Sequence, residues 1–349
     1  MTVPDKNAAA DPISVIEALY ETGWSDGLPI VPPSRRRVAD FVAASGRAAD
    51  DLVATMPPMG GLATVEKLAA NAVMAGCKPE FMPVIIAAVD ALLDPKVNVG
   101  GMICSMHSAI PLLILNGPVR GILGVNSGFN VFGQGHRANA TLGRAINLIL
   151  VNLGGARPGE ADRSTFGQPG NFAFCIAENE EQSPFDPLHV DRGFSRDDST
   201  VTVIGAEPPH INNNATAETP QNVLLTTVSM MKNLGSMNSY LQGESVICLS
   251  PEHADIVARH GWKKRDVQQF LFEHARNPIR ELKRGGPYGA DVEKYKTWPR
   301  WIDRSDDDAL VPVARQPNDF MVLVAGGPGK QTAYLPTWAT RSATRKIAI

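Results

Sequence analysis

The segment SVICLSPEHADIVARHG, residues 245–261, decides the fold class because a short apolar run passes directly into a capped helix. Residues 245–249 are typical of a buried strand. Ser250 is a good N-cap, Pro251 suits the first helical position, and Gly261 is a natural helix stop. Strands alternating with helices predict an α/β fold, with right-handed crossovers and a mainly parallel or mixed sheet that carries helices on both faces. The neighbouring elements expected on the same grounds are strands 200–204 and 320–325 and helices 220–234 and 263–275.

The first half of the chain is less regular, and its elements are predicted from apolar spacing and from Gly and Pro residues. The polar stretch 178–199 marks a change along the chain, so we expect two closely packed α/β subdomains, residues 1–195 and 196–349. The Pro-interrupted stretch 276–317 is expected to be a surface excursion or a contact between subunits. The helices expected in the first half are 12–20, 64–76, 79–93 and 136–153, and the expected strands are 97–104, 111–115, 119–125 and 171–177.

Composition argues against several classes of protein. The 349 residues carry 33 Lys and Arg against 36 Asp and Glu, a net charge of −3, whereas a nucleic-acid-binding protein normally presents a basic face. Four widely separated cysteines without a CxxC pair argue against a disulfide framework and favour a reducing compartment. The first twelve residues lack the features of a secretory signal, and no apolar stretch approaches the ~20 residues of a spanning helix. We therefore expect a cytoplasmic protein that binds neither nucleic acid nor membrane.

The glycine-rich stretch NSGFNVFGQGHRANATLGRA, residues 126–145, is the most informative motif for binding. Its glycines lead into a helix, so free backbone amides, the positive end of the helix dipole and a guanidinium are expected to point at one place. That combination predicts a site for a substrate carboxylate or phosphate, although a purely structural glycine turn explains the same residues. GGPGK, residues 326–330, is a second candidate of this kind. The predicted substrate-binding residues of the first stretch are Asn126, Ser127, Asn130, His136, Arg137 and Asn139.

Two further candidates lie where predicted strands end, since ligands of open parallel sheets bind beyond the carboxyl ends of the strands. Asn116 ends one apolar run and is expected to bind substrate. Glu178 directly follows another, and a carboxylate held there in a low-dielectric environment would have a raised pKa suited to proton transfer. Glu180 and Glu181 are expected to be solvated or paired with Arg192.

The loop GWSDGLPIVPPS, residues 23–34, is too rich in Gly and Pro to be a helix or a central strand. It is predicted to be a packed connection. The functional alternative is a pocket wall that presents Asp26 to the substrate.

Cysteine and histidine supply the remaining chemical candidates. CSMH places Cys104 three residues from His107, a pair that can give a reactive thiolate and a general acid or base, although buried thiols are usually inert. Cys104, His107, Glu178 and His189 are all suitable ligand types for a divalent metal, yet neither HExxH nor paired CxxC is present, so no metal or other cofactor is assigned. His253, on a predicted helix, is expected to be exposed.

The segments GWSDGLPIVPP, LLILNGPVRGILGVNSGFNVFGQGHRANATLGRAINLILVNLGG and CIAENEEQSPF together resemble a bacterial family whose members carry a GW[ST]DGLP[IV]VPP opening. That family is associated with the UGSC group of thiol or selenol proteins. The resemblance covers most of residues 13–194 and returns at LSPEHADIVARHGW and VLVAGGPGK. It implies an enzyme of small-molecule catabolism with a thiol or selenol protein as a partner. This chain has no UGSC motif, so thiol chemistry would have to use Cys104 or that partner.

The leading functional hypothesis is a lyase or hydrolase that acts on a small anionic substrate. It would cleave a carbon–heteroatom bond by acid–base catalysis, with Glu178 or His107 transferring the proton. One alternative is a non-catalytic substrate-binding or scaffold subunit of a thiol or selenol reductase system, and another is a redox enzyme that uses Cys104. A symmetric homo-oligomer is expected, because it is the commoner state of such enzymes.

Overall fold

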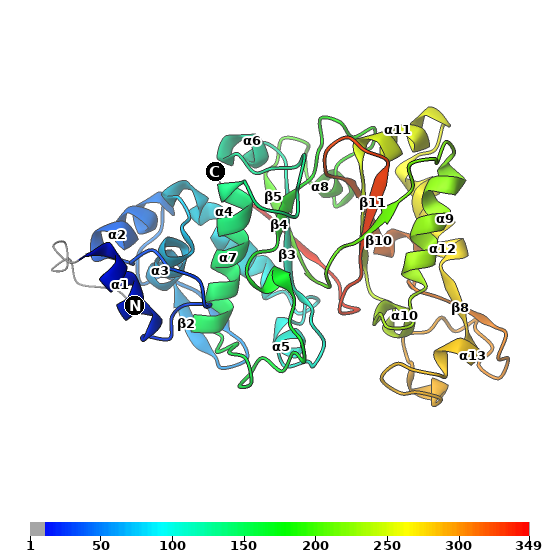
Figure 1. Cartoon of the computed structure of the whole chain (residues 1–349), viewed down its shortest axis with the longest axis horizontal. Helices are drawn as coiled ribbons and strands as arrows, with labels where there is room; N and C mark the ends of the chain where they lie inside the picture. The colour runs from blue at the N-terminus through cyan, green and yellow to red at the C-terminus, as the bar shows by residue number, and fades with distance from the viewer. Residues whose placement is uncertain (1–10, 349) are drawn as a thin grey trace.

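The computed structural model describes residues 11–348 and is built of four layers, in the order helices, sheet, sheet, helices (Figure 1). The first four-stranded sheet has the order β12 (Ala343–Lys346), β5 (Thr200–Ala206), β3 (Ile110–Asn116) and β4 (Cys175–Ala177). The second has the order β10 (Phe320–Val324), β7 (Ser245–Leu249), β11 (Gln331–Leu335) and β6 (His210–Asn213). The pairs β3–β4 and β10–β7 are parallel, and the other neighbours in these sheets are antiparallel. The expected α/β class with mixed sheets is therefore confirmed.

Alternate residues of each strand belong to different cores, because successive side chains of a strand point to opposite faces. In β3, Leu113 and Leu115 pack with the helices of the outer layer, whereas Leu112 and Ile114 face the second sheet. The strands of the second sheet alternate in the same way. The inner faces of the two sheets therefore pack against each other, and helices cover the outer face of each sheet rather than both faces of one sheet.

The outer helical layers follow their sequence signals. Thr64 caps α3 by accepting a hydrogen bond from the Lys67 N–H, and Gly76 ends the helix with φ +87°. The helices predicted over 64–76 and 79–93 are therefore confirmed as α3 and α4. On the first sheet lie α4 (Met82–Leu92) and α7 (Arg137–Asn152). α3 (Val65–Ala75) packs against both of these helices, and α1 (Pro12–Tyr20), α2 (Arg35–Ala44) and the hairpin of β1 (Leu52–Met56) and β2 (Gly61–Thr64) lie further out. On the second sheet lie α9 (Pro220–Met231), α11 (Pro251–Arg259) and α12 (Lys264–His274).

Two predicted strands are wrong, because residues 97–104 contain α5 (Val99–Ile103) and residues 119–125 contain α6 (Val119–Leu123). In α5 the buried residues are Val99, Met102 and Ile103, which is a helical spacing. In α6, Pro118 stands at the N-cap and Gly124 ends the helix with φ +65°. Short apolar runs fit either element, and in both places the helix signals decide.

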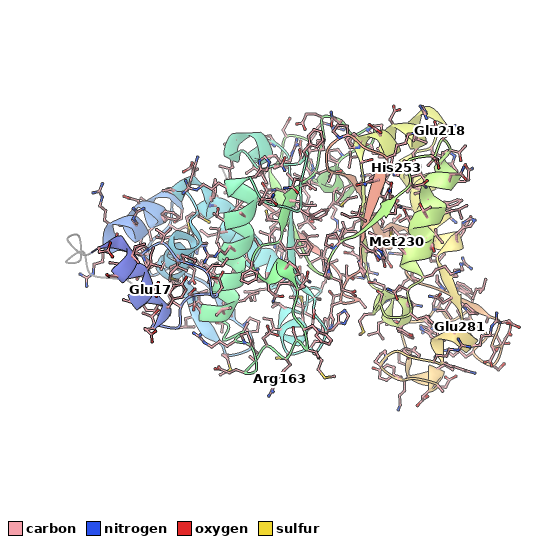
Figure 2. All side chains as sticks on the ribbon, viewed as in Figure 1. Glu17, Arg163, Glu218, Met230, His253 and Glu281 are labelled. Atoms are coloured by element: carbon pink, nitrogen blue, oxygen red, sulfur yellow. The ribbon has the colours of Figure 1, made fainter. Side chains whose placement is uncertain are left out.

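His253 is also corrected, since it is buried rather than exposed (Figure 2). It lies on α11, and its Nδ1 is 2.9 Å from the Thr332 hydroxyl of β11. The helix therefore presents this histidine to the second sheet.

The boundary predicted between residues 195 and 196 stays a prediction as a division into folding units. The sheets are not divided there, because strands from both sides of it pair in one sheet. β5 and β12, from the second half of the chain, complete the sheet of β3 and β4. The stretch 276–317 carries a small core of its own, in which Trp298 is buried and its indole N–H donates to the Tyr240 carbonyl. Short elements here and elsewhere are α8 (Leu188–Asp191), α10 (Asn238–Leu241), β8 (Arg276–Pro278), α13 (Ile279–Leu282), β9 (Leu310–Pro312) and the 3₁₀ turns η2 (Pro79–Phe81), η3 (Pro169–Asn171), η4 (Val292–Lys294) and η5 (Pro317–Asp319).

Among residues 11–348, no helix combines the length and apolar character needed to cross a bilayer. The expectation of no secretory signal rests mainly on residues 1–10, which lie outside the described residues.

Candidate functional site

The ends of β3 and β4 place Asn116 and Glu178 side by side. The two strands run parallel with Leu115 opposite Ala177, so the next residue of each strand reaches the same edge of the sheet. The Glu178 backbone N–H donates to the Leu115 carbonyl at 3.1 Å, and Asn116 Nδ2 donates to Glu178 Oε2 at 2.6 Å. The sheet itself therefore builds this pair.

Glu178 is a fully buried carboxyl group whose pKa lies near neutrality. Burial raises the pKa of Glu178 to about 7, while the charge of Lys264 and hydrogen bonds from the Leu188 N–H and from Asn116 act in the opposite direction. The Leu188 N–H donates to Oε2 at 2.8 Å, whereas the buried Oε1 accepts no hydrogen bond from another described residue. Near pH 7 this group can therefore hold or release a proton, with one oxygen uncommitted.

A set of buried or nearly buried polar groups surrounds this pair. Glu180 Oε1 accepts from the Gly117 N–H at 2.7 Å and lies 3.1 Å from Arg120 Nε. Arg120 also donates to the Glu178 carbonyl at 2.9 Å. His189 is buried, and its Nδ1 lies 3.9 Å from Glu180 Oε1 without a hydrogen-bond partner in the described part of the chain. We name Asn116, Arg120, Glu178, Glu180 and His189 the Glu178 cluster.

Sequence reasoning missed Arg120 because it assigned this segment to a strand. Arg120 Nη2 lies 3.0 Å from Glu181 Oε1. Glu181 is exposed, as one of the two expectations had it, and its partner is Arg120 and not Arg192. A usable signal was present, since Pro118 and Gly124 stand where a short helix begins and ends.

A charged cavity of about 390 Å³ lies next to the Glu178 cluster. Leu188, whose N–H donates to Glu178, lines it, and so does Lys264, whose charge acts on Glu178. Lys264 pairs with Asp191 at 2.6 Å, whereas Arg265 is exposed and makes no ion pair with another described residue. The basic residues of the lining are Arg192, Lys264, Arg265 and Arg341, and the acidic ones are Asp191, Glu244 and Asp319. None of these residues was predicted as a binding residue.

Cys104 and His107 are not brought together with Glu178. Both precede β3, whereas Glu178 lies beyond its other end, and a strand of this length spans roughly 20 Å at its usual rise. His107 Nε2 lies 2.9 Å from Glu207 Oε1, and Cys104 is exposed at the end of α5. No group of three His, Cys, Asp or Glu side chains in residues 11–348 is arranged to hold a metal ion. The metal set considered from the sequence is thus not assembled.

Arg137, the guanidinium expected at an anion site in the stretch 126–145, binds backbone carbonyls instead. Arg137 donates from Nε to the Gly76 carbonyl at 3.0 Å and from Nη2 to the Cys77 carbonyl at 3.1 Å, so its guanidinium closes the end of α3. His136 is exposed, and its side chain caps no backbone N–H of α7. The predicted convergence of a guanidinium with the helix start is therefore absent from this part of the structure.

The asparagines of the stretch 126–145 hold the loop in shape. Asn139 is buried and binds both the backbone N–H and the carbonyl of Asn126, at 2.8 and 2.9 Å. Asn126 Oδ1 accepts from the Gly128 N–H at 2.9 Å, and Asn130, with φ +57°, donates from Nδ2 to the Gln134 carbonyl. Each of these side chains has a structural partner.

Asp26 also has a structural partner, because it forms two hydrogen bonds with the Arg144 guanidinium at 2.7 and 2.8 Å. Its side chain is nearly buried. This contact ties the 23–34 loop to α7, as expected of a packed connection.

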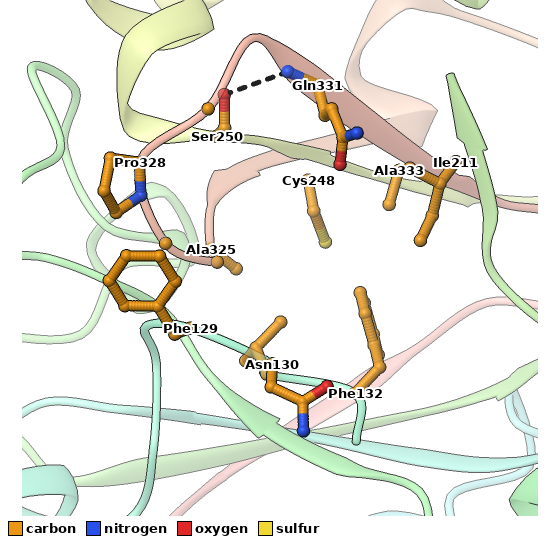
Figure 3. Close-up of a pocket in the computed structure, with 14 residues that line it drawn as sticks. Phe129, Asn130, Phe132, Ile211, Cys248, Ser250, Ala325, Pro328, Gln331 and Ala333 are labelled. Atoms are coloured by element: carbon orange, nitrogen blue, oxygen red, sulfur yellow. Dashed lines mark hydrogen bonds between the residues drawn. The ribbon is translucent and has the colours of Figure 1, made fainter. Parts of the chain in front are cut away.

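The two glycine-rich stretches meet, since the Gly326 N–H donates to the Ser127 carbonyl at 2.8 Å. Between them lies a pocket of about 270 Å³, the glycine-loop pocket, which residues 129–132 and the ends of β7, β10 and β11 line (Figure 3). No charged side chain among the described residues lines it. Cys248 points into it, and the pKa of Cys248 is raised by burial and further by the negative charge of Glu178. The Glu178 cluster therefore lies within electrostatic reach of this pocket.

A scan against protein-family models and a search of curated proteins found no match to this chain. The resemblance to the family with the GW[ST]DGLP[IV]VPP opening stays a prediction.

We expect one of the four cysteines to react with Ellman's reagent in the native protein. Cys104 is exposed, whereas Cys77, Cys175 and Cys248 are buried and burial raises the pKa of each thiol, which removes the reactive thiolate. The measurement is the number of thiols titrated before and after unfolding in guanidinium chloride. In Cys104→Ser the native count should drop to none, and a second rapidly reacting native thiol would contradict the buried positions.

Proposed function

We propose that this chain is an enzyme that transfers a proton to or from a small anionic substrate, with Glu178 as general acid or base, in the cleavage of a carbon–heteroatom bond. The observation that carries the proposal is the buried Glu178 carboxyl group, with a pKa raised to about 7 and one oxygen that accepts no hydrogen bond from another described residue. Acid–base groups are most effective when their pKa lies near the working pH. An exposed carboxylate such as Glu181, whose pKa is lowered mainly by its hydrogen bond from Arg120, is fully ionised there and lacks this property.

Glu178 alone can accept and return the one proton that such a cleavage moves. In an elimination, the Glu178 carboxylate takes a proton from the carbon next to the substrate carboxylate, and the C–H electron pair forms the new double bond. The carbon–heteroatom bond breaks with its electron pair on the heteroatom, which then receives the proton from Glu178. In a hydrolysis the proton comes from the attacking water and returns to the leaving group. The lyase and hydrolase versions therefore share one residue and differ in the substrate.

We place the anionic group of the substrate in the charged cavity. Its four basic side chains exceed its three acidic ones, and Arg265 has no partner among the described residues that would have to be displaced. Leu188 stands between this cavity and Glu178, since it lines the cavity and binds Glu178 through its N–H. The proposal therefore includes a shift of the four-residue helix α8 when substrate binds.

The test is a turnover screen of small carboxylates and phosphate esters with the purified chain. For any compound that turns over, Glu178→Gln should reduce kcat at least about a hundredfold, the usual scale of a lost acid–base group. Glu181→Gln, three positions along and exposed, is the matched control and should keep kcat. Arg265→Gln should raise KM several-fold with little change in kcat, because it removes a charge that binds the substrate and transfers no proton.

A kcat in Glu178→Gln equal to that of the unchanged protein would overturn this mechanism.

A second candidate, a redox enzyme that uses Cys104, is favoured by the exposure of that thiol. It would be supported if Cys104→Ser abolished a turnover that Glu178→Gln retains. Activity of the purified chain alone separates both from a scaffold subunit. The cytoplasmic location, the homo-oligomer and the thiol or selenol protein partner stay predictions.

A further inference from the structure

We propose that the glycine-loop pocket is a second binding site, which takes a neutral, planar, bicyclic heterocycle of the purine type. It shares no lining residue with the charged cavity in which we place the anionic substrate. The inference therefore goes beyond the proposed function. It rests on the charge, the size and the polar rim of the pocket.

The charge of the lining selects a neutral ligand. Among its side chains the polar groups are those of Asn130, Ser250 and Gln331, together with the Cys248 thiol, and none is ionised at neutral pH. Lys330, the lysine of the stretch 326–330, pairs with Glu218 and does not line the pocket. Moving an ionised group into such a site would remove its hydration without supplying a counter-charge. A neutral ligand avoids that penalty.

The size and walls of the pocket fit a flat bicyclic ring. Its volume of about 270 Å³ exceeds the ~150 Å³ of an apolar protein cavity that takes up benzene. Phe129 and Phe132 stand at opposite sides of the cavity in Figure 3, and the Phe129 side chain is 69% exposed. An exposed phenyl ring on a pocket wall offers a stacking surface for a heterocycle.

The glycine loop holds Phe129 in this position. A Cβ on Gly327 would lie 2.3 Å from Cδ1 of the Phe129 ring, so only glycine lets the ring pack this closely. Gly326 and Gly329 have φ values of +98° and +145°, and a Cβ on either would meet no atom within 4 Å. These two glycines are required by backbone conformation, and the space beside them stays open to a ligand.

The polar rim supplies the hydrogen bonds that a purine edge requires. The Gln331 side chain, which points toward the cavity in Figure 3, makes no hydrogen bond to another described residue. Its amide carries a donor and an acceptor side by side, the arrangement that matches the amino group and ring nitrogen of adenine. Ser250 Oγ accepts from the His253 and Gln331 N–H groups at 3.3 and 3.5 Å, which leaves its own hydroxyl proton for a ligand nitrogen.

The experiment is titration of the full chain with adenine at pH 7, followed by calorimetry and by saturation-transfer NMR. Saturable binding is expected, weakened about tenfold in Phe129→Ala through the loss of stacking and several-fold in Gln331→Ala. Phe166→Ala is the matched control, since that side chain is 94% exposed and does not line the pocket. The melting temperature of each variant shows that it is folded, and Gln331→Ala carries the test if Phe129→Ala does not fold.

Three results would overturn the proposal. One is the absence of saturable adenine binding, and another is binding of benzoate, a planar anion, more tightly than adenine. The third is loss of adenine binding in Arg265→Gln, which would assign the heterocycle to the charged cavity. Retained adenine binding in a chain that shows no turnover would support this site while leaving the proposed enzyme function unsupported, so the two can fail separately.

Discussion

Alanine at Gly117 is expected to lower the free energy of unfolding by about 4 kcal/mol. Gly117 follows Asn116 and has φ +79°, a conformation that costs a non-glycine residue about 1–3 kcal/mol. A Cβ there would also lie 2.0 Å from the carbonyl oxygen of Asp198, so one of the two backbones must move. Overpacking of this kind typically adds about 1–3 kcal/mol. Urea denaturation of Gly117→Ala and the unchanged protein measures the sum.

Two nearby glycines separate the contributions to this loss. Gly124 has φ +65° and nothing within 4 Å of a Cβ, so Gly124→Ala should cost about 1 kcal/mol from backbone conformation alone. Gly121 lies within α6 with equally open space, and Gly121→Ala should be neutral or stabilise the protein by up to about 1 kcal/mol. Equal losses in all three variants would show that the close approach of Gly117 to Asp198 does not exist in solution.

Gly117 also links the fold to the Glu178 cluster, because its N–H donates to Glu180. A backbone shift at this position should therefore disturb Glu180 as well as the packing. In Gly117→Ala, turnover should fall further than the loss of folded protein accounts for.

The single elements of the fold were predictable where caps and apolar spacing agree. Ser250 accepts a hydrogen bond from the His253 N–H at the start of α11, and Gly76 ends α3 in the left-handed region. These signals act between residues three or four positions apart, so the sequence carries them directly. The two segments assigned wrongly, α5 and α6, are short apolar runs that fit either a strand or a helix, and Pro118 and Gly124 at the ends of α6 are the helix signal that was missed.

The layering could not be predicted, because an apolar strand residue looks the same whether a helix or a second sheet covers it. Leu112 and Leu113 are adjacent leucines in β3, yet Leu112 faces the second sheet and Leu113 faces the helices. The antiparallel pairing of β5 with β3 joins residues about 90 positions apart and has no local signal in either strand. The result is two sheets that face each other, where the alternation of strands and helices indicated helices on both faces of a sheet.

The candidate site was predictable in part. The raised pKa of Glu178 follows from its position directly after a buried strand, and this expectation is confirmed. The neighbouring sequence does not determine which way a long side chain points. Arg137, for example, binds the Gly76 carbonyl at the end of α3. The charged cavity gathers Arg192, Lys264 and Arg341 from three distant segments, so only the folded chain reveals it.

The ionisation of Glu178 is expected by itself to lower the free energy of unfolding by about 3 kcal/mol as the pH rises from about 4.5 to about 7. Its pKa is raised from 4.5 to about 7 by burial, and each pKa unit corresponds to about 1.4 kcal/mol. Between these values the folded chain holds a proton that the unfolded chain has released, so the free energy of unfolding falls as the pH rises. Below about pH 4.5 both states are protonated at this position, and above about pH 7 both are ionised, so the contribution is then constant.

Glu178→Gln should remove this fall, because the amide stays neutral and its oxygen can still accept from the Leu188 N–H. At pH 8 the variant should be more stable than the unchanged protein by about 2–3 kcal/mol, while at pH 4 the two should be nearly equal.

Glu181→Gln is the control and should keep the decrease in stability between about pH 4.5 and about pH 7. The pKa of Glu181 is lowered, so its ionised form is favoured in the folded chain. Urea midpoints for the three proteins at a series of pH values supply the measurement, and a stability difference between Glu178→Gln and the unchanged protein that does not vary with pH would refute the buried acid. If Glu178→Gln gains stability at neutral pH and loses turnover, the Glu178 carboxyl group lowers the free energy of unfolding of the natural chain. That relation is expected of a residue that serves the reaction and not the fold.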